Sequence, residues 1–437
     1  MRRVKEAVHL EDDTEYKQVT ISLNHGGVKL RGTKHGHEIK TKRQYRTSAG
    51  HFILSRIDAR NAAFGIVPPE LKGAIITNDF WTFEIDEALV SREYFHLFTR
   101  TDAFLEACVR ASTGTTNRQR IREGFFLDYT FDLPPRDEQD RIVARFEEAE
   151  AHWLVAQDEL ERQRDDLILL RQRILDDAMR GRLVPQDPED EPASVLLERI
   201  AAEKERLVKA GTIRRAKKLP PVSAEEQPYD LPPSWEWVRL ISLLREGLSN
   251  GRSVKTRDGG FPVLRLTALG GQTVDTVESK PGDWDESEAR QFVIQENDFL
   301  IARGNGSLSL VGRGSLVAEV LEPVAFPDTM IRIRVFSDAC DPVFLFHLWN
   351  SSLVRKQIET QARSTSGLHK INQGHVRNIT VPLPPFEEQR RIVDLIDELL
   401  TVCDALEARL EAARADAEAL MQAVLREAFV GGEPVAS

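Results

Sequence analysis

One stretch of the sequence occurs twice, and this repeat limits what the chain can fold into. Residues 133–143 read LPPRDEQDRIV, and residues 383–393 read LPPFEEQRRIV. Between residues 133 and 181 the two copies align without an insertion, and 18 of the 49 aligned positions are identical. An internal duplication of this extent predicts a twofold repeated architecture.

Each copy of the repeat predicts one long helix. The proline pair disfavours helix before it and permits helix after it, and the acidic residues that follow suit the positive end of a helix dipole. Apolar residues then recur at alternating steps of three and four, which places them along one seam. The seam residues are Ile142, Phe146, Trp153, Leu160, Leu167, Leu170 and Ile174 in the first helix, and Ile392, Ile396, Leu399, Leu406, Leu410, Leu420 and Val424 in the second.

Two such seams are most simply buried by packing the two helices on each other, although two ordinary bundle helices would also fit the pattern. The chain then reads as globule, helix, globule, helix, in agreement with the two or three domains expected for 437 residues. Residues 1–131 carry a net charge of +3, whereas residues 382–437 carry −7. The total of −11 therefore does not exclude a nucleic-acid partner, because surface patches matter more than totals.

Composition narrows the cellular setting. No apolar run approaches the ~18 residues of a membrane span, and the first residues lack the apolar core of a secretory signal. Cys108, Cys340 and Cys403 are odd in number and far apart, without the spacing of a metal site. These features predict a cytoplasmic protein.

The first globule contains a basic segment with polar and aromatic residues between the charges. Such a segment suits the phosphates of a nucleic acid, and the alternative is a solvated loop. A polar loop near residues 112–121 adds two more arginines, and Arg56 lies in a predicted strand at 52–57. A predicted helix at 92–109 carries aromatic residues expected in the core. The predicted DNA contacts are Lys29, Arg31, Lys34, Lys40, Lys42, Arg43, Arg46, Arg56, Arg118 and Arg120.

The second globule repeats this plan loosely. Arg303 matches Arg56 at an offset of 247 residues, and Lys370 matches Arg120 at an offset of 250 residues. The globules diverge more than the helices do, which suggests one scaffold that presents two different recognition surfaces. The predicted DNA contacts here are Arg252, Lys255, Arg257, Arg303, Arg313, His369 and Lys370.

Motifs of catalysis are missing from the sequence. There is no GxxxxGK[ST] phosphate loop, no Asn/Asp-Pro-Pro-aromatic motif of an amino-methyltransferase and no Cys or His pattern of a metal site. We therefore predict a non-catalytic chain without catalytic residues, a metal or a cofactor of its own. A nuclease or methyltransferase that acts alone, and a coiled-coil adaptor that joins two proteins without DNA, are the alternatives.

These residues resemble the specificity subunit of type I restriction–modification systems. Both Leu-Pro-Pro-x-x-Glu-Gln-x-x-Ile-Val stretches are similar to the starts of that family's two conserved spacer regions. Residues 231–238 resemble the opening of its target-recognition domain, and residues 367–371 also fit the pattern. The first globule departs from it, because it has no Leu-Pro-x-x-Trp-x-Trp opening.

The resemblance implies an α+β fold in which two mixed α/β target-recognition domains are separated by two long helices. The helices would form an antiparallel coiled coil with a pseudo-twofold repeat. The expected domains are residues 1–132 and 229–382 for recognition, 133–215 and 383–437 for the spacer helices (the first with an additional short helix), and a linker at 216–228.

The resemblance also implies the partners. The two recognition domains would read a split target in double-stranded DNA, and the helices, with the seam residues given above, would dock two methyltransferase subunits. Motor-nuclease subunits would join this complex. S-adenosylmethionine, ATP and Mg²⁺ would then be bound by the partner subunits and not by this chain.

Overall fold

The computed structural model describes residues 1–114, 119–215, 219–365 and 367–430. The chain divides into two compact units. Unit 1 comprises Met1–Glu161 with the described residues from Leu410 onward, and unit 2 comprises Arg162–Arg409. Two long helices, α4 (Arg136–Met179) and α11 (Phe386–Val430), contribute to both units. In the described part of the chain, no helix has both the length and the apolar character that crossing a membrane requires.

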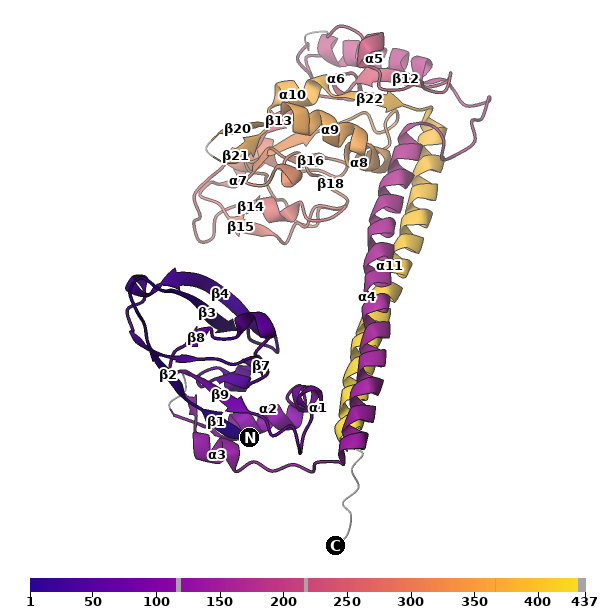
Figure 1. Ribbon diagram of the computed structural model, residues 1–437. Coiled ribbons are helices and arrows are strands. Elements are labelled where there is room, and N and C mark those ends of the chain that lie inside the picture. The colour runs from indigo at the N-terminus through magenta and orange to yellow at the C-terminus, as the bar shows by residue number, and fades with distance from the viewer. Residues whose placement is uncertain (115–118, 216–218, 366, 431–437) are drawn as a thin grey trace. The chain divides into compact units, whose positions relative to one another are not determined.

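Unit 1 is built on two larger sheets and the two-stranded pair β10-β11 (Figure 1). One has the order β1-β9-β6-β7, and the other has the order β2-β5-β8-β3-β4 with β4 at an edge. The strands are β1 (Arg2–Val4), β2 (Glu6–His9), β3 (Glu15–Ile21), β4 (Val28–His35), β5 (Arg43–Arg46), β6 (Phe52–Ser55), β7 (Phe64–Ile66), β8 (Ile75–Ile76), β9 (Phe80–Glu84), β10 (Ser112–Thr113) and β11 (Arg120–Ile121). The short helices are α1 (Arg92–Phe98), α2 (Asp102–Arg110) and α3 (Glu123–Leu127).

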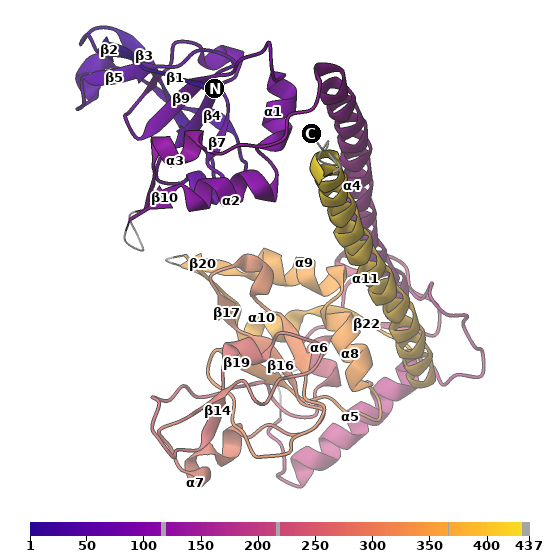
Figure 2. The same cartoon turned by 90° about the horizontal axis from the view of Figure 1, so that it is seen from below.

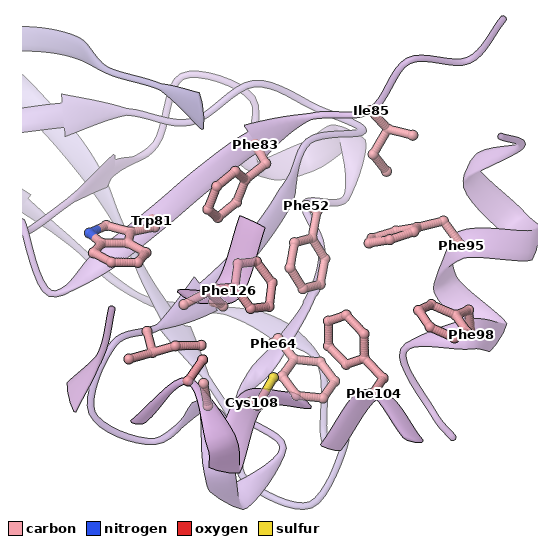
Figure 3. Packing of buried hydrophobic residues seen from close by; sticks show 14 of the residues in the cluster. Phe52, Phe64, Trp81, Phe83, Ile85, Phe95, Phe98, Phe104, Cys108 and Phe126 are labelled. Atoms are coloured by element: carbon pink, nitrogen blue, oxygen red, sulfur yellow. The ribbon is translucent and has the colours of Figure 1, made fainter. Parts of the chain in front are cut away.

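An aromatic core holds unit 1 together between its first sheet and its short helices (Figure 3). The ring of Phe104 stands edge-on to Phe52 and Phe64, with centroid distances of 5.9 and 5.0 Å. Phe95 is edge-on to Phe52 at 5.2 Å. Edge-to-face pairs of this kind add to the stabilisation from burial. The predicted core role of the aromatics in the 92–109 segment is confirmed, but the segment forms two helices, because Thr101 accepts a hydrogen bond from Phe104 N and starts a second one.

Unit 2 contains a four-stranded sheet of order β13-β19-β16-β18, a three-stranded sheet β17-β21-β20, and the pairs β12-β22 and β14-β15. Its strands are β12 (Glu236–Arg239), β13 (Ser249–Asn250), β14 (Pro262–Leu264), β15 (Ser279–Pro281), β16 (Phe299–Ala302), β17 (Gly304–Asn305), β18 (Gly314–Leu316), β19 (Met330–Ile333), β20 (Arg363–Thr365), β21 (Leu368–Lys370) and β22 (Thr380–Leu383). Its short helices are α5 (Ala193–Lys209), α6 (Leu240–Leu243), α7 (Glu286–Ala289), α8 (Pro342–Trp349), α9 (Ser352–Gln361) and α10 (Gln373–Asn378). Helix α5 packs against α6 (Figure 2), where Lys204 Nζ donates to the carbonyls of Ile241 and Ser242.

The repeat in the sequence has a structural counterpart in two buried glutamines. Gln139, at the start of α4, accepts from Ser91 N at 2.8 Å and donates to the carbonyls of Leu89 and Pro134. Gln389, 250 residues later at the start of α11, makes the same three bonds, to Asp341 N, Ala339 O and Pro384 O. Ser91 and Asp341 are the N-caps of α1 and α8. Each glutamine therefore ties a long helix to the first turn of a helix in its own globule.

The two long helices lie side by side within each unit. In unit 1, Phe146 of α4 is buried in one cluster with Leu425 of α11 and Leu97 of α1. In unit 2, Arg171 of α4 pairs with Asp404 and Glu407 of α11, at 2.6 and 3.0 Å. Each unit therefore contains its own contacts between the two long helices.

The predicted seam is buried only in part. Phe146, Leu167, Ile174, Ile392 and Ile396 are buried, as the seam requires. In contrast, Leu170, Leu406 and Leu420 are 43%, 40% and 66% exposed, so the prediction that they lie on the buried seam was wrong. Two paired helices cover only a narrow stripe of each other, and a sequence repeat of 3.5 residues drifts off the face of a helix with ~3.6 residues per turn.

The remaining seam positions are intermediate in exposure. They lie between the buried stripe and the solvent-facing side, where the long helices cover each other incompletely; these residues are Ile142, Trp153, Leu160, Leu399, Leu410 and Val424.

Candidate nucleic-acid interface

The candidate site in unit 1 is assembled where the central strand of its first sheet ends. Arg56 directly follows β6, and its backbone N donates to Asp79 O at 2.8 Å. The Arg56 carbonyl accepts from Ile121 N at 2.9 Å, which brings β11 and therefore Arg120 beside it. Two cations from distant parts of the sequence are thus joined by backbone hydrogen bonds.

A buried tryptophan packs against two arginines at this site. Trp81 of β9 is only 4% exposed, so it cannot serve as an open stacking platform for a base. The guanidinium carbons of Arg3 and Arg56 lie 4.4 and 4.8 Å from the centroid of its ring, within the range of cation–π attraction. This packing holds the two arginines in place and costs less conformational entropy on binding than mobile side chains would.

The cluster lines a cleft of about 510 Å³. Its lining contains five cationic side chains and the single carboxylate of Glu123, which pairs with Arg3. Its residues are Arg3, Lys5, Arg56, Asn78, Trp81, Thr113, Arg120, Ile121, Arg122 and Glu123.

The cleft also holds unused hydrogen-bonding groups. In the described residues, Arg3 Nε, Arg56 Nε and Trp81 Nε1 are buried without a hydrogen-bond partner. A buried donor without a partner is costly. A concave, cationic surface with spare donors is suited to a phosphate group or the polar edge of a base.

Unit 2 carries the counterpart of this arrangement. Arg303 directly follows β16, its backbone N donates to Thr329 O at 2.8 Å, and its carbonyl accepts from Ile371 N at 2.9 Å. Lys370 therefore lies beside Arg303, as Arg120 lies beside Arg56. Position 331, which corresponds to Trp81 at an offset of 250, is an isoleucine, so Arg303 has no matching aromatic support. Instead its Nη1 donates to Asp328 O at 3.3 Å.

The basic segment 29–46 lies on the other sheet of unit 1 and does not line this cleft. Two of its predicted contacts hold the protein's own backbone: Lys42 donates to Gly36 O at 2.7 Å and pairs with Asp12, and Arg46 donates to Gly73 O at 3.4 Å. Solvent-exposed members of the segment are better placed for phosphates, namely Lys29, Arg31 and Lys34 on edge strand β4, together with Lys40 and Arg43.

The other predicted contacts of unit 2 are more scattered. Arg257 pairs with Asp283 at 2.8 Å, Arg313 donates to Gly270 O at 2.8 Å, and the guanidinium of Arg252 lies 6.0 Å from the ring of Trp284. Lys255 is exposed, and His369 of β21 is half-buried. Arg118 lies outside the described residues.

Several residues of the cleft were absent from the sequence prediction. Arg3, Lys5 and Arg122 line it together with Arg56 and Arg120. The only signal for the first two was a cluster of basic residues within the first five positions, which the sequence separates from Arg56 by some fifty residues. Their pairing with the cleft depends on β1 (Arg2–Val4) lying beside β9, a contact that no local pattern predicts.

Comparison with known proteins shows what the chain is similar to. Residues 235–413 match the family described as the type I restriction modification DNA specificity domain. The chain is also 29% identical over 372 residues to the specificity subunit of the type I restriction enzyme EcoEI of Escherichia coli, an alignment that covers 74% of this chain. Over this alignment the chain is therefore similar to the specificity subunits of type I restriction–modification systems. The alignment spans 62% of the length of the EcoEI specificity subunit.

Solved structures show the same fold as this chain. One, titled for complex assembly and conformational transition of the type I R-M system, aligns over 98% of this chain and 94% of its own, with a TM-score of 0.66 and 20% identity. The HsdS subunit of Thermoanaerobacter tengcongensis aligns over 98% and 95%, with a TM-score of 0.50 and 20% identity. The mixed α/β character predicted from the sequence is confirmed by these similarities.

Proposed function

We propose that this chain is a specificity subunit that recognises a bipartite target in double-stranded DNA, with each globule reading one half-site. The observation that carries this proposal is the repeated pair of cations at the end of the central strand, Arg56 with Arg120 and Arg303 with Lys370. Equivalent backbone hydrogen bonds position both pairs of cations, whereas the side chains around the two pairs differ. One scaffold that presents two different polar surfaces suits two different half-sites.

We also propose the finer architecture predicted from the repeat. Residues 1–132 and 229–382 would be the two target-recognition domains, and α4 and α11 would pair as an antiparallel coiled coil with pseudo-twofold symmetry. The contacts between α4 and α11 within each unit and the matching glutamines Gln139 and Gln389 support this arrangement.

The proposed partners follow from the family. Two methyltransferase subunits would dock on the helices, and motor-nuclease subunits would complete the restriction complex. Methyl transfer from S-adenosylmethionine and ATP- and Mg²⁺-dependent translocation would occur on those subunits. In this scheme the chain selects the DNA site and performs no bond chemistry of its own.

The test begins with methylome sequencing of a host that carries this chain with its methyltransferase subunit. The expected result is one methylated motif made of two defined half-sites separated by undefined bases. The reconstituted complex is then titrated with a duplex of that motif at several salt concentrations. Assembly without any DNA affinity would refute the proposal and favour the adaptor.

A pair of variants locates the interface in unit 1. Arg120→Gln removes an exposed cation of the cleft, so the slope of log K against log [salt] should fall by about 0.9, the value for one lost phosphate contact. Arg110→Gln is the matched control, because Arg110 is also exposed but lies on α2 outside the cleft and pairs with Glu106. Equal slopes for both variants would place the DNA elsewhere.

A further inference from the structure

The internal repeat allows the two halves of the chain to be compared residue by residue, and one segment differs sharply. Strand β22 (Thr380–Leu383) is fully buried in unit 2. The corresponding residues 130–133 of unit 1 are not in a strand, and all but Phe131 are exposed. Leu133 is 41% exposed, whereas its counterpart Leu383 is 0% exposed. The same sequence position is therefore covered in one unit and open in the other.

Strand β12 is what covers this position in unit 2. It pairs antiparallel with β22 from Glu236 opposite Leu383 to Arg239 opposite Thr380. Trp235, just before β12, is buried and donates its indole N–H to Glu388 Oε2 at 2.9 Å. Burial raises the pKa of Glu388 above its ordinary value, which reflects how completely this strand and its tryptophan seal the start of α11.

In unit 1 the same surface has an open edge. No described strand pairs with residues 130–133. Glu138, the counterpart of Glu388, is only half-buried and pairs with Arg141 at 3.0 Å on its own helix. Phe125 and Leu127 of the preceding helix α3 are 62% and 40% exposed. An unpaired backbone edge beside exposed apolar side chains is a template for strand addition.

Phe131 holds this segment against the core of unit 1, and the ladder of unit 2 indicates which of its backbone groups would pair. The ring of Phe131 stacks on Phe98 at a centroid distance of 4.0 Å and anchors the segment to the aromatic core. Hydrogen-bonded pairs alternate along an antiparallel ladder. Leu240 N donates to Ile379 O at 2.9 Å, so Leu240 and Ile379 form a hydrogen-bonded pair. Counting every second pair from there, Leu383 opposite Glu236 is also hydrogen-bonded, whereas Pro382, which has no N–H, lies in a pair without hydrogen bonds. At the positions 250 residues earlier in the chain, Leu133 N–H would donate a hydrogen bond to an added strand, and Asp132 N–H would not.

We propose that residues 130–133 form a docking edge for an extended segment with the chemistry of β12, namely a Leu-Pro-Pro-x-Trp-x-Trp-Val strand supplied to unit 1. The incoming strand would pair with the backbone of Phe131 and Leu133. Its first tryptophan would lie against the start of α4 and donate to Glu138. Docking would bury Leu133 and complete unit 1 in the way that β12 completes unit 2.

The probe is a labelled peptide of residues 228–240 of this chain, titrated into the full chain and followed by fluorescence anisotropy. Saturable binding with one peptide per chain is expected. Replacement of Trp235 and Trp237 by alanine in the peptide should weaken binding, because these rings supply most of the apolar area.

Two proline variants of the protein distinguish this edge from any other site. Leu133→Pro removes the N–H that the docked strand would need and should weaken peptide binding by about 10-fold, the equivalent of ~1.4 kcal/mol for one hydrogen bond with its surroundings. Asp132→Pro is the matched control, because unit 2 has Pro382 at this position, and it should bind within about twofold of the unmodified chain.

One outcome of this experiment supports the docking edge, and two outcomes overturn it. Loss of binding in Leu133→Pro alone, with both variants unchanged in circular dichroism, supports the docking edge. Absence of binding to the unmodified chain overturns it. Equal binding by both variants also overturns it, because the peptide would then exchange with β12 in unit 2 or bind elsewhere.

Discussion

Replacement of Gln389 by leucine should loosen the attachment of α11 to its globule. Gln389 is fully buried and makes three hydrogen bonds, all to backbone groups: Asp341 N at 2.9 Å, Ala339 O at 3.1 Å and Pro384 O at 3.0 Å. Leucine has a similar volume but no polar atoms, so little cavity is created and the lost bonds dominate. At ~1 kcal/mol for each bond, Gln389→Leu should lower the free energy of local opening by about 3 kcal/mol.

The assay is hydrogen exchange across the first turn of α8 (Pro342–Trp349), because Asp341 is its N-cap and its backbone N–H is held by Gln389. About 3 kcal/mol corresponds to exchange roughly 150-fold faster in this turn, if exchange proceeds through local opening. Gln422→Leu on the exposed face of α11 is the matched control and should leave exchange in this turn unchanged.

If Gln389→Leu lowers the free energy of local opening by less than about 0.5 kcal/mol, the reasoning is refuted. That outcome would mean that the three backbone groups find other hydrogen-bond partners at no cost. The repeat provides an internal check. Gln139→Leu removes the equivalent three bonds in unit 1 and should accelerate exchange at the first turn of α1 by a similar factor.

Two further predictions concern the long helices. His347 is 2% exposed with Nε2 3.2 Å from Asp397 Oδ1 of α11, and its burial holds its pKa below the ordinary value despite that carboxylate. The unfolded chain therefore binds more protons as the pH falls through about 6.5, so unit 2 should lose stability there. His347→Leu should flatten urea midpoints between pH 7.5 and 5.5, and an unchanged pH dependence would contradict this assignment. Phe146→Ala should destabilise unit 1 by about 3–5 kcal/mol in urea unfolding, whereas Leu154→Ala, at a position 57% exposed, should change it by less than ~0.5 kcal/mol; equal losses would mean that the buried stripe lies elsewhere.

The repeat was readable from the sequence because each copy carries its own local instructions. The proline pair, the acidic first turn and the apolar spacing predict a long helix twice, and helices form at 136–179 and 386–430. The matches of Arg56 with Arg303 and of Arg120 with Lys370 were also found from spacing alone. Both pairs sit beside strongly apolar strands whose patterns survive divergence.

Local sequence pattern was less informative where a side chain forms a hydrogen bond with a nearby backbone group. The 92–109 segment has continuous helical periodicity, yet the Thr101 side chain caps a new helix and divides it. Likewise Lys42 and Arg46 look like free cations in the basic segment but bind carbonyls of nearby turns. A charge run in a sequence does not reveal which of its members face solvent.

The sequence by itself determined the duplication and the two long helices, since these depend on short-range periodicity and on residues a few positions apart. Only the tertiary structure decided which cations share a cleft, because Arg3, Trp81 and Arg122 meet Arg56 through strand pairings and loop contacts far apart in the chain. It also decided that residues 130–133 are open while β22 is covered. Backbone pairing between distant segments leaves no signature in either segment alone, since any extended stretch offers the same N–H and C=O groups.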